Sequence, residues 1–216
     1  MSIVIGMSTA QIAALSAQQI KDLGTADFKA MTTAQVAALG ANDTAQITAI
    51  ETQDLVVLST GQIQALKVYN ANGGFTASQV QALTTAQVKA LTGAQFGGSA
   101  TNDISEMLAE QLKAIDVEDF AGMSNAQIGQ LTPTNFKELT TAQIAGLSSS
   151  QLSSLGTNYF ANMTTDQMRA MSTDAVKALS FGAGSQLAAI GTTGLASLTT
   201  SQIAALSTDQ VASLTT

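Results

Sequence analysis

Hydroxyl and glutamine side chains recur at a fixed spacing, and these are the residues with the clearest chemical role in the sequence. A Ser or Thr is followed three residues later by Gln, as in Thr140 and Gln143. In this capping box the hydroxyl accepts a hydrogen bond from the third amide of a helix, and the glutamine accepts from the amide of the hydroxyl residue. The spacing therefore predicts helix starts at Ser8/Gln11, Ser16/Gln19, Thr32/Gln35, Thr84/Gln87, Thr92/Gln95, Ser124/Gln127, Thr140/Gln143, Ser148/Gln151, Thr164/Gln167, Thr199/Gln202 and Ser207/Gln210.

Catalytic chemistry has few candidate residues in this chain. The sequence contains no His and no Cys, which excludes His-dependent triads, disulfides, thiol chemistry and the usual zinc sites. No glycine-rich phosphate loop follows a strand pattern. We expect a protein that is not an enzyme and has no cofactor, no metal site and no catalytic residue.

One cluster of acidic residues could be considered for calcium. A calcium site needs several carboxylate or carbonyl oxygens that converge on one ion, and the EF-hand spacing is absent here. We interpret the acids as first-turn residues that interact favourably with the helix dipole. The cluster consists of Asp103, Glu106, Glu110, Asp116, Glu118 and Asp119.

Pairs of threonines, such as Thr140-Thr141 and Thr199-Thr200, raise a second binding hypothesis. A regular array of threonine hydroxyls could match an ice lattice. In a capping box, however, the first hydroxyl of each pair is already used by the backbone. We therefore favour the helix cap over ice binding.

The element that carries these residues is an octad, best seen in Leu139–Leu147. Apolar residues at positions zero and five of the octad form a hydrophobic staple around the cap. A new helix start follows eight residues later, so each helix must be shorter than two turns and end in a corner. Pro133 fits this frame because it follows Thr132 at the first helical position.

A short fixed period predicts an all-α solenoid of short capped helices, because such helices bury their apolar faces only by stacking on neighbours. We expect a single repeat domain over residues 1–216, with frame slips near 40–42, 67–74 and 180–182. The alternative is a β-solenoid, since Thr, Val and Ile tolerate strands. The octad alone determines neither the number of octads per coil nor the handedness.

The charge and polarity of the sequence argue against two classes of partner, nucleic acids and membranes. The net charge of −7 argues against nucleic acid, which needs clustered Lys and Arg. The uncharged stretch 178–208 is interrupted by hydroxyls and Gln, so we expect no membrane insertion.

The octads of Leu83–Leu91, Leu139–Leu147 and Leu198–Leu206 resemble Leu-Thr-Thr-Ala-Gln-Ile-Ala-Ala-type repeats of large bacterial secreted and surface proteins. The resemblance implies an exported, adhesive or structural role, outside the cell or at the bacterial cell surface. It carries no catalytic residue.

The two ends of the repeat array suggest self-association. Solenoids normally carry terminal repeats with a polar outer face, and the octad pattern here stays apolar to the last residues. Two different apolar ends would form a heterologous contact, which gives an open filament if it does not close into a ring. We expect a homopolymer built by end-to-end stacking, with an adhesin or scaffold module of a larger protein as the alternative. The expected assembly residues are Ile3, Val4, Ile5, Ile203, Leu206, Val211 and Leu214.

Overall fold

The computed structural model describes residues 2–41, 43, 45–66, 74–92, 95–96 and 104–214. These residues form 22 helices and contain no strand. The shortest helices have four residues and the longest has seven. The predicted all-α solenoid of short helices is therefore confirmed, and the β-solenoid alternative is not supported.

Ten of the eleven predicted capping boxes are complete in the structure. The eleventh, Thr92/Gln95, flanks residues 93 and 94, which lie outside the described residues. In α14 (Thr141–Gly146), the Thr140 hydroxyl accepts from the Gln143 amide at 3.2 Å, and the Gln143 side chain accepts from the Thr140 amide at 3.0 Å. Pro133 occupies the first position of α13 (Pro133–Lys137), behind the Thr132 cap. Complete boxes are present at Ser8, Ser16, Thr32, Ser59, Thr76, Thr84, Ser124, Thr140, Ser148, Thr164, Thr199 and Ser207.

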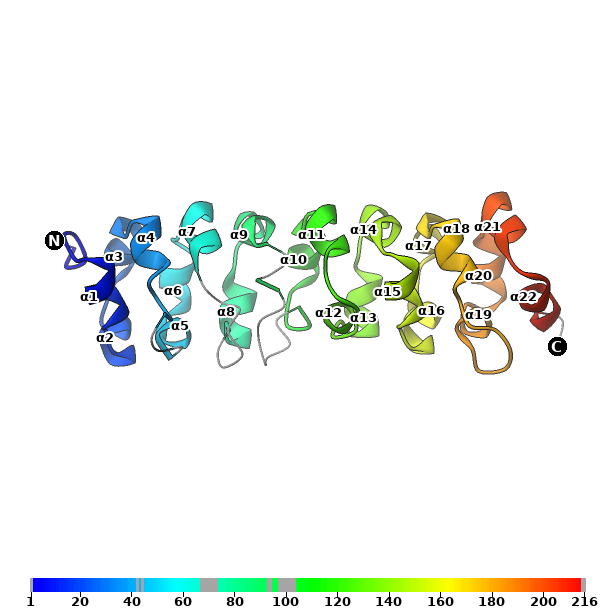
Figure 1. Cartoon of the computed structure of the whole chain (residues 1–216), viewed down its shortest axis with the longest axis horizontal. Coiled ribbons are helices and arrows are strands. Elements are labelled where there is room, and N and C mark those ends of the chain that lie inside the picture. Colours follow the sequence, from blue (N-terminus) through cyan, green and yellow to red (C-terminus); the bar gives the residue numbers. More distant parts are fainter. Residues whose placement is uncertain are drawn as a thin grey trace. The chain divides into compact units, whose positions relative to one another are not determined.

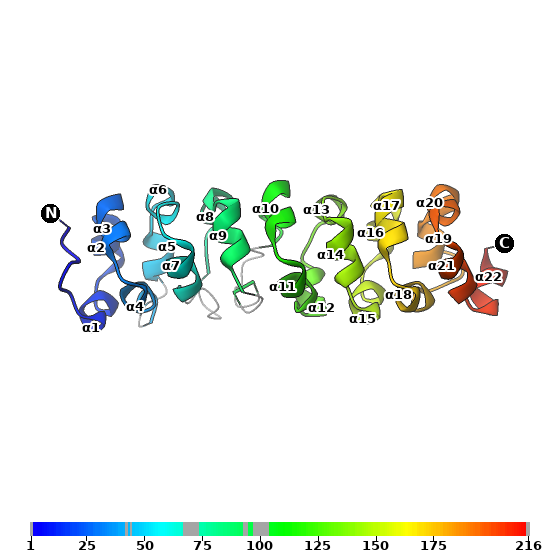
Figure 2. The same cartoon turned by 90° about the horizontal axis from the view of Figure 1, so that it is seen from above.

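The chain divides into two compact units, Met1–Ile115 and Asp116–Thr216. In the second unit, the helices from α14 to α21 each stack on the third helix before them, which makes three columns of helices (Figures 1 and 2). The columns are α11 (Val117–Ala121), α14, α17 (Thr165–Ala170) and α20 (Gly191–Ser197); α12 (Asn125–Ile128), α15 (Ser149–Ser153), α18 (Thr173–Lys177) and α21 (Thr200–Ala205); and α13, α16 (Thr157–Asn162) and α19 (Gln186–Ala189). The last helix is α22 (Thr208–Ser213).

Three octads therefore complete one coil of the solenoid. Thr141 of α14 and Thr165 of α17 begin stacked helices, and they are 24 residues apart in the sequence. The sequence alone does not contain this number. Each coil is a triangle whose sides are single octads.

The first unit follows the same plan. One column contains α1 (Thr9–Ala13), α4 (Thr33–Val36), α7 (Thr60–Ala65), α9 (Thr85–Ala90) and α10 (Ala109–Ala114). A second contains α2 (Ala17–Lys21) and α5 (Ala45–Ala49), and a third contains α3 (Thr25–Ala30), α6 (Thr52–Leu55) and α8 (Ala77–Ala82). The expectation of one domain over 1–216 stays a prediction, since each unit is described by itself.

Apolar residues at positions zero and five fill the inside of the triangle. Leu139, Ile144 and Leu147 are all less than 5 % exposed. Large rings at position five, such as Phe136 and Phe160, are buried as well. The core of each unit is therefore a stack of layers that continues from coil to coil.

The slips at 40–42 and 180–182 add three residues to a corner. In both, the glutamine side chain reaches six residues back instead of three: Gln46 accepts from the Gly40 amide at 2.8 Å, and Gln186 accepts from the Ser180 amide at 3.0 Å. Gly40 has φ of 73°, and a Cβ there would lie 2.9 Å from the Ile47 side chain. Residues 42 and 67–73, which belong to predicted slips, lie outside the described residues.

Candidate assembly surfaces

The glutamines at position four have a second hydrogen-bonding role that the capping box does not require. The Gln151 side chain accepts from the Ser148 amide at 2.7 Å and uses its Nε2 to donate to the Ala121 and Met123 carbonyls, at 3.1 and 2.6 Å. These carbonyls belong to the preceding coil. One side chain thus caps its own helix and joins two coils.

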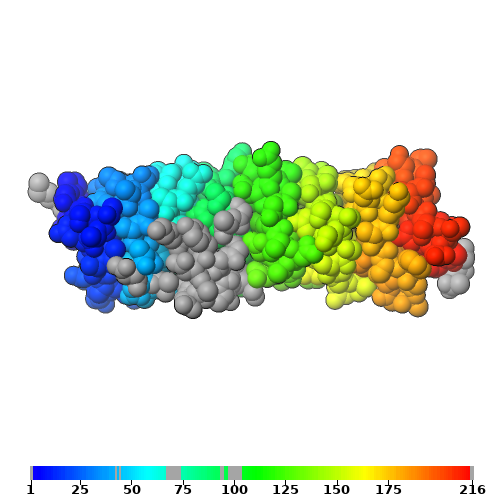
Figure 3. Space-filling model, in the orientation of Figure 1, coloured from blue at the N-terminus to red at the C-terminus, as the bar shows by residue number. Residues whose placement is uncertain are grey.

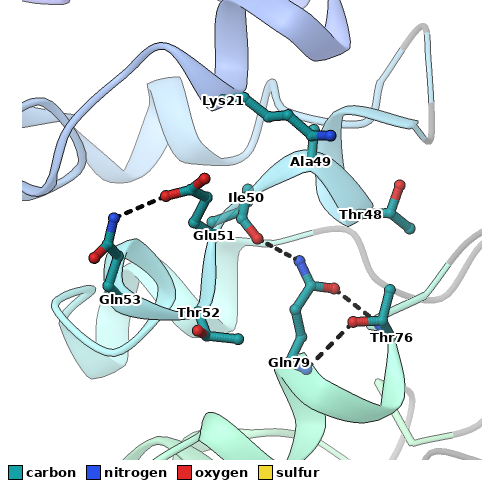
Figure 4. A pocket seen from close by; sticks show the side chains of 9 residues that line it. All are labelled: Lys21, Thr48, Ala49, Ile50, Glu51, Thr52, Gln53, Thr76 and Gln79. Carbon is teal, nitrogen blue, oxygen red and sulfur yellow. Dashed lines mark hydrogen bonds between the residues drawn. The ribbon is translucent and has the colours of Figure 1, made fainter.

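The same arrangement recurs in both units, and we call it the glutamine ladder. In Figure 4 the amide of Gln79 accepts from Thr76 and donates to the carbonyl of Ile50. The carbonyls that accept belong to residues 28 to 34 positions earlier in the sequence. The donors are Gln35, Gln46, Gln62, Gln79, Gln87, Gln95, Gln111, Gln151, Gln167, Gln186, Gln202 and Gln210.

These hydrogen bonds contribute to stability because the glutamine side chains that make them are buried. The ladder residues Gln111, Gln151 and Gln167 are less than 5 % exposed, so an unpaired amide there would be costly. Tyr159 takes the ladder position in α16, where its hydroxyl lies 3.2 Å from the Gly129 carbonyl and 2.5 Å from that of Leu131. A tyrosine hydroxyl can therefore replace the glutamine amide as the donor at the ladder position.

The capping-box pattern does not predict the ladder, although the sequence contains one signal for it. Glutamate serves a capping box as well as glutamine, and its charge is favourable at a helix N-terminus. Gln nevertheless dominates position four. Only the amide can accept from the cap and donate to a second group at the same time.

The first coil of the chain, α1 to α3, is a different case because its ladder donors are unused. Gln11 and Gln19 are exposed, and each accepts from its cap residue at 2.8 Å. Within the described residues, neither Nε2 atom donates a hydrogen bond. Beside them lies an apolar hollow of about 280 Å³, lined by Ile3, Met7, Leu15, Gln19, Asp22 and Leu23.

The predicted assembly residues at this end separate into two groups. Ile3 and Ile5 are 67 % and 69 % exposed. Val4 is fully buried, because it takes the position-five place in front of α1 and its carbonyl accepts from Gln35. Val4 is thus not part of the exposed surface. We define the N-terminal face as Ile3, Met7, Gln11, Leu15 and Gln19.

The last coil, α20 to α22, lies at the C-terminal end of the second unit (Figures 1 and 3), and it exposes residues that are buried in inner coils. Ile203 and Val211 occupy position five and are 44 % and 47 % exposed, whereas Ile144 and Leu152 are fully buried at the same position. Leu206 is half-buried and Leu214 is 38 % exposed. We define the C-terminal face as Ile203, Leu206, Val211 and Leu214.

Backbone acceptors accompany this apolar surface. The carbonyls of Leu198 and Leu206 stand where Met171 and Leu179 accept from Gln202 and Gln210 one coil earlier. In the part of the chain that the structure describes, neither carbonyl accepts a hydrogen bond. The C-terminal face therefore offers acceptors and protruding side chains, and the N-terminal face offers donors and a hollow.

Within the described residues, the acidic cluster offers no geometry that would bind a metal ion. The acids Glu110, Glu118 and Asp119 lie in the first turns of α10 and α11, and Asp103 lies outside the described residues. Among the described residues, no group of three or more acidic side chains could hold a metal ion. No helix among those residues has the length and apolar character needed to cross a membrane.

Fold and faces define a repeat protein of the all-α solenoid class. A family model described as ALTTAQ repeat matches residues 4–41 and 185–216, which contain the first and the last coils. The resemblance to Leu-Thr-Thr-Ala-Gln-Ile-Ala-Ala-type repeats is thereby confirmed. Comparison with curated proteins found no match.

Proposed function

We propose that this chain is a non-enzymatic structural protein whose copies stack end to end into a filament, outside the cell or at the bacterial cell surface. The observation that carries the proposal is the exposure of Ile203 and Val211 at a position that is fully buried in inner coils. Each inner coil covers such residues with the next coil. The first coil of a second copy can cover Ile203 and Val211 in the same way, because it exposes the side that an inner coil turns toward the coil before it.

The two faces differ in shape, which favours a polar filament. Position-five residues of the first coil, Ile12 and Ile20, are fully buried, so the N-terminal face presents the opposite side of a coil. Exposed Ile203 and Val211 of one copy can enter the hollow between Met7 and Leu15 of the next. Such a contact is heterologous, and it propagates as a filament unless its rotation closes a ring.

Apolar burial supplies the driving force. Full burial of one large aliphatic side chain is worth about 1.5–3 kcal/mol, and several partly exposed side chains meet at the proposed joint. The location outside the cell is supported by the resemblance to repeats of bacterial secreted and surface proteins.

Light scattering against protein concentration tests the proposal. We expect the wild-type chain to grow in mean mass as concentration rises, and Ile203→Asp or Ile3→Asp to stay monomeric. Val56→Asp is the matched control, because Val56 is 37 % exposed but lies on the side of an inner coil after α6. Wild-type protein that stays monomeric at every concentration would reject the filament and favour an adhesin or scaffold module.

A further inference from the structure

The inner coils show a fixed relation between a ladder bond and helix stacking. Gln202 of α21 donates to the carbonyls of Met168 and Met171, and α21 stacks on α18, which begins two residues after Met171. Each ladder glutamine thus bonds the end of one octad and lies over the helix that follows it. The relation determines which helices meet when one bond is known.

We infer that the glutamine ladder continues from one copy of the chain to the next, with Gln11 and Gln19 of one copy donating to the carbonyls of Leu198 and Leu206 of another. This inference rests on the proposed end-to-end assembly and specifies its register. It places α1 of the second copy on α21 of the first, and α2 on α22. Both exposed side chains, Ile203 and Val211, are then covered.

The neighbouring registers fit less well. If α1 stacked on α20, the residues that precede α1 would need the place that α22 already fills. Gln35 donates to the Val4 and Met7 carbonyls as a ladder glutamine, so Val4–Met7 behaves as the end of an octad. If α1 stacked on α22, Val4–Met7 would lie over the end of α21, and the half-buried Leu195 of α20 would stay uncovered.

In the inferred register, Val4–Met7 lies over the end of α20. Leu195 there is half-buried, although it occupies position five. The segment at the start of one copy then covers the third position-five residue at the end of the other. In this one register, the Gln11 and Gln19 donors meet the Leu198 and Leu206 carbonyls, and the exposed apolar side chains of the last coil are covered.

The double variant Gln11→Glu/Gln19→Glu tests the register. A glutamate keeps the size and the acceptor of the capping box, but it replaces each Nε2 donor with an oxygen that repels the carbonyls. Both side chains are exposed in the single chain, so the melting temperature of the monomer should not change. The matched control is Gln64→Glu/Gln81→Glu, which adds the same charge at exposed glutamines of inner coils.

The readout is mean mass by sedimentation velocity across a concentration series. We expect the double variant to need at least about tenfold more protein for half-assembly than the wild type, because two hydrogen bonds are lost and the added charges repel the carbonyls. The control should assemble like the wild type.

The outcomes separate the register from the assembly itself. If the double variant assembles like the wild type while Ile203→Asp stays monomeric, the register is wrong and the assembly stands. If the control is impaired as strongly as the double variant, the effect is one of net charge and the register is overturned. If the wild type never assembles, both proposals fail.

Discussion

The Nε2 atom of Gln151 lies 2.6 Å from the carbonyl oxygen of Met123, which is 28 residues earlier in the chain. This bond joins two coils, and the Oε1 atom of the same amide caps α15 through the Ser148 amide at 2.7 Å. Helix initiation and coil stacking therefore depend on one side chain. The relation explains why the repeat retains glutamine at this position.

Gln151→Glu should destabilise the second unit although it preserves the capping box. The variant removes the donor to Met123 and places a buried oxygen against two carbonyls, which costs about 1–3 kcal/mol, or more while the glutamate is charged. Urea unfolding of this variant beside Gln64→Glu, an exposed glutamine, measures the difference. Equal stabilities of the two variants would show that the ladder bonds contribute nothing.

Asp54 should make the stability of the first unit depend on pH. It occupies the ladder position of α6, is 1 % exposed, and neither carboxylate oxygen has a hydrogen-bond partner within the described residues. Burial, and then the charges of Glu51 and Asp27, raise the pKa of Asp54 above its ordinary value. Lys21 and Glu51 both line a hollow of the first unit (Figure 4).

The sign of the effect follows from the raised pKa. The folded state binds the Asp54 proton more tightly than the unfolded state, so this contribution to stability is full below the unfolded pKa of about 3.9 and is lost as pH rises through the folded pKa. Asp54→Gln supplies the missing donor, and at neutral pH it should add about 1–3 kcal/mol to the free energy of unfolding.

Thermal melts between pH 3 and 8 measure this pH dependence. The wild type should lose stability relative to Asp54→Gln as pH increases. The exposed Asp22→Gln is the control and should keep the wild-type dependence. Parallel curves for the wild type and Asp54→Gln would contradict the assignment.

Substitutions within one octad should rank by position. Leu147→Ala and Ile144→Ala each remove a side chain that is at most 2 % exposed, and each should cost about 2–5 kcal/mol. Thr140→Ala loses the cap of α14 and should cost about 1 kcal/mol. Lys137→Ala, at an exposed position, should be near neutral in equilibrium unfolding. A loss at Lys137 as large as that at Leu147 would show that the octad frame is misplaced.

Local features of the fold could be predicted from the sequence because they depend on neighbouring residues. Thr140 and Gln143 specify a helix start within four residues, and Pro133 marks the first position of another helix. The number of octads per coil depends instead on bonds such as the one between Gln151 and Met123, which no local pattern specifies.

The assembly surfaces were predictable only in part. The apolar character of Ile203 and Val211 is evident from the sequence, and the structure places both at the exposed end of the last coil. Val4 appears equivalent to Ile3 in the sequence, but its register in the coil buries it. Gln11 lies in an octad that closely resembles inner octads, and the sequence pattern alone does not show that its donor is unused.

Electron microscopy of the purified chain of residues 1–216 tests the central claim most directly. Images recorded across a range of protein concentrations should show unbranched filaments that lengthen with concentration for the wild type, and single particles for Ile203→Asp. The Val56→Asp control should form filaments like the wild type. Uniform single particles of the wild-type protein at every concentration would contradict end-to-end stacking.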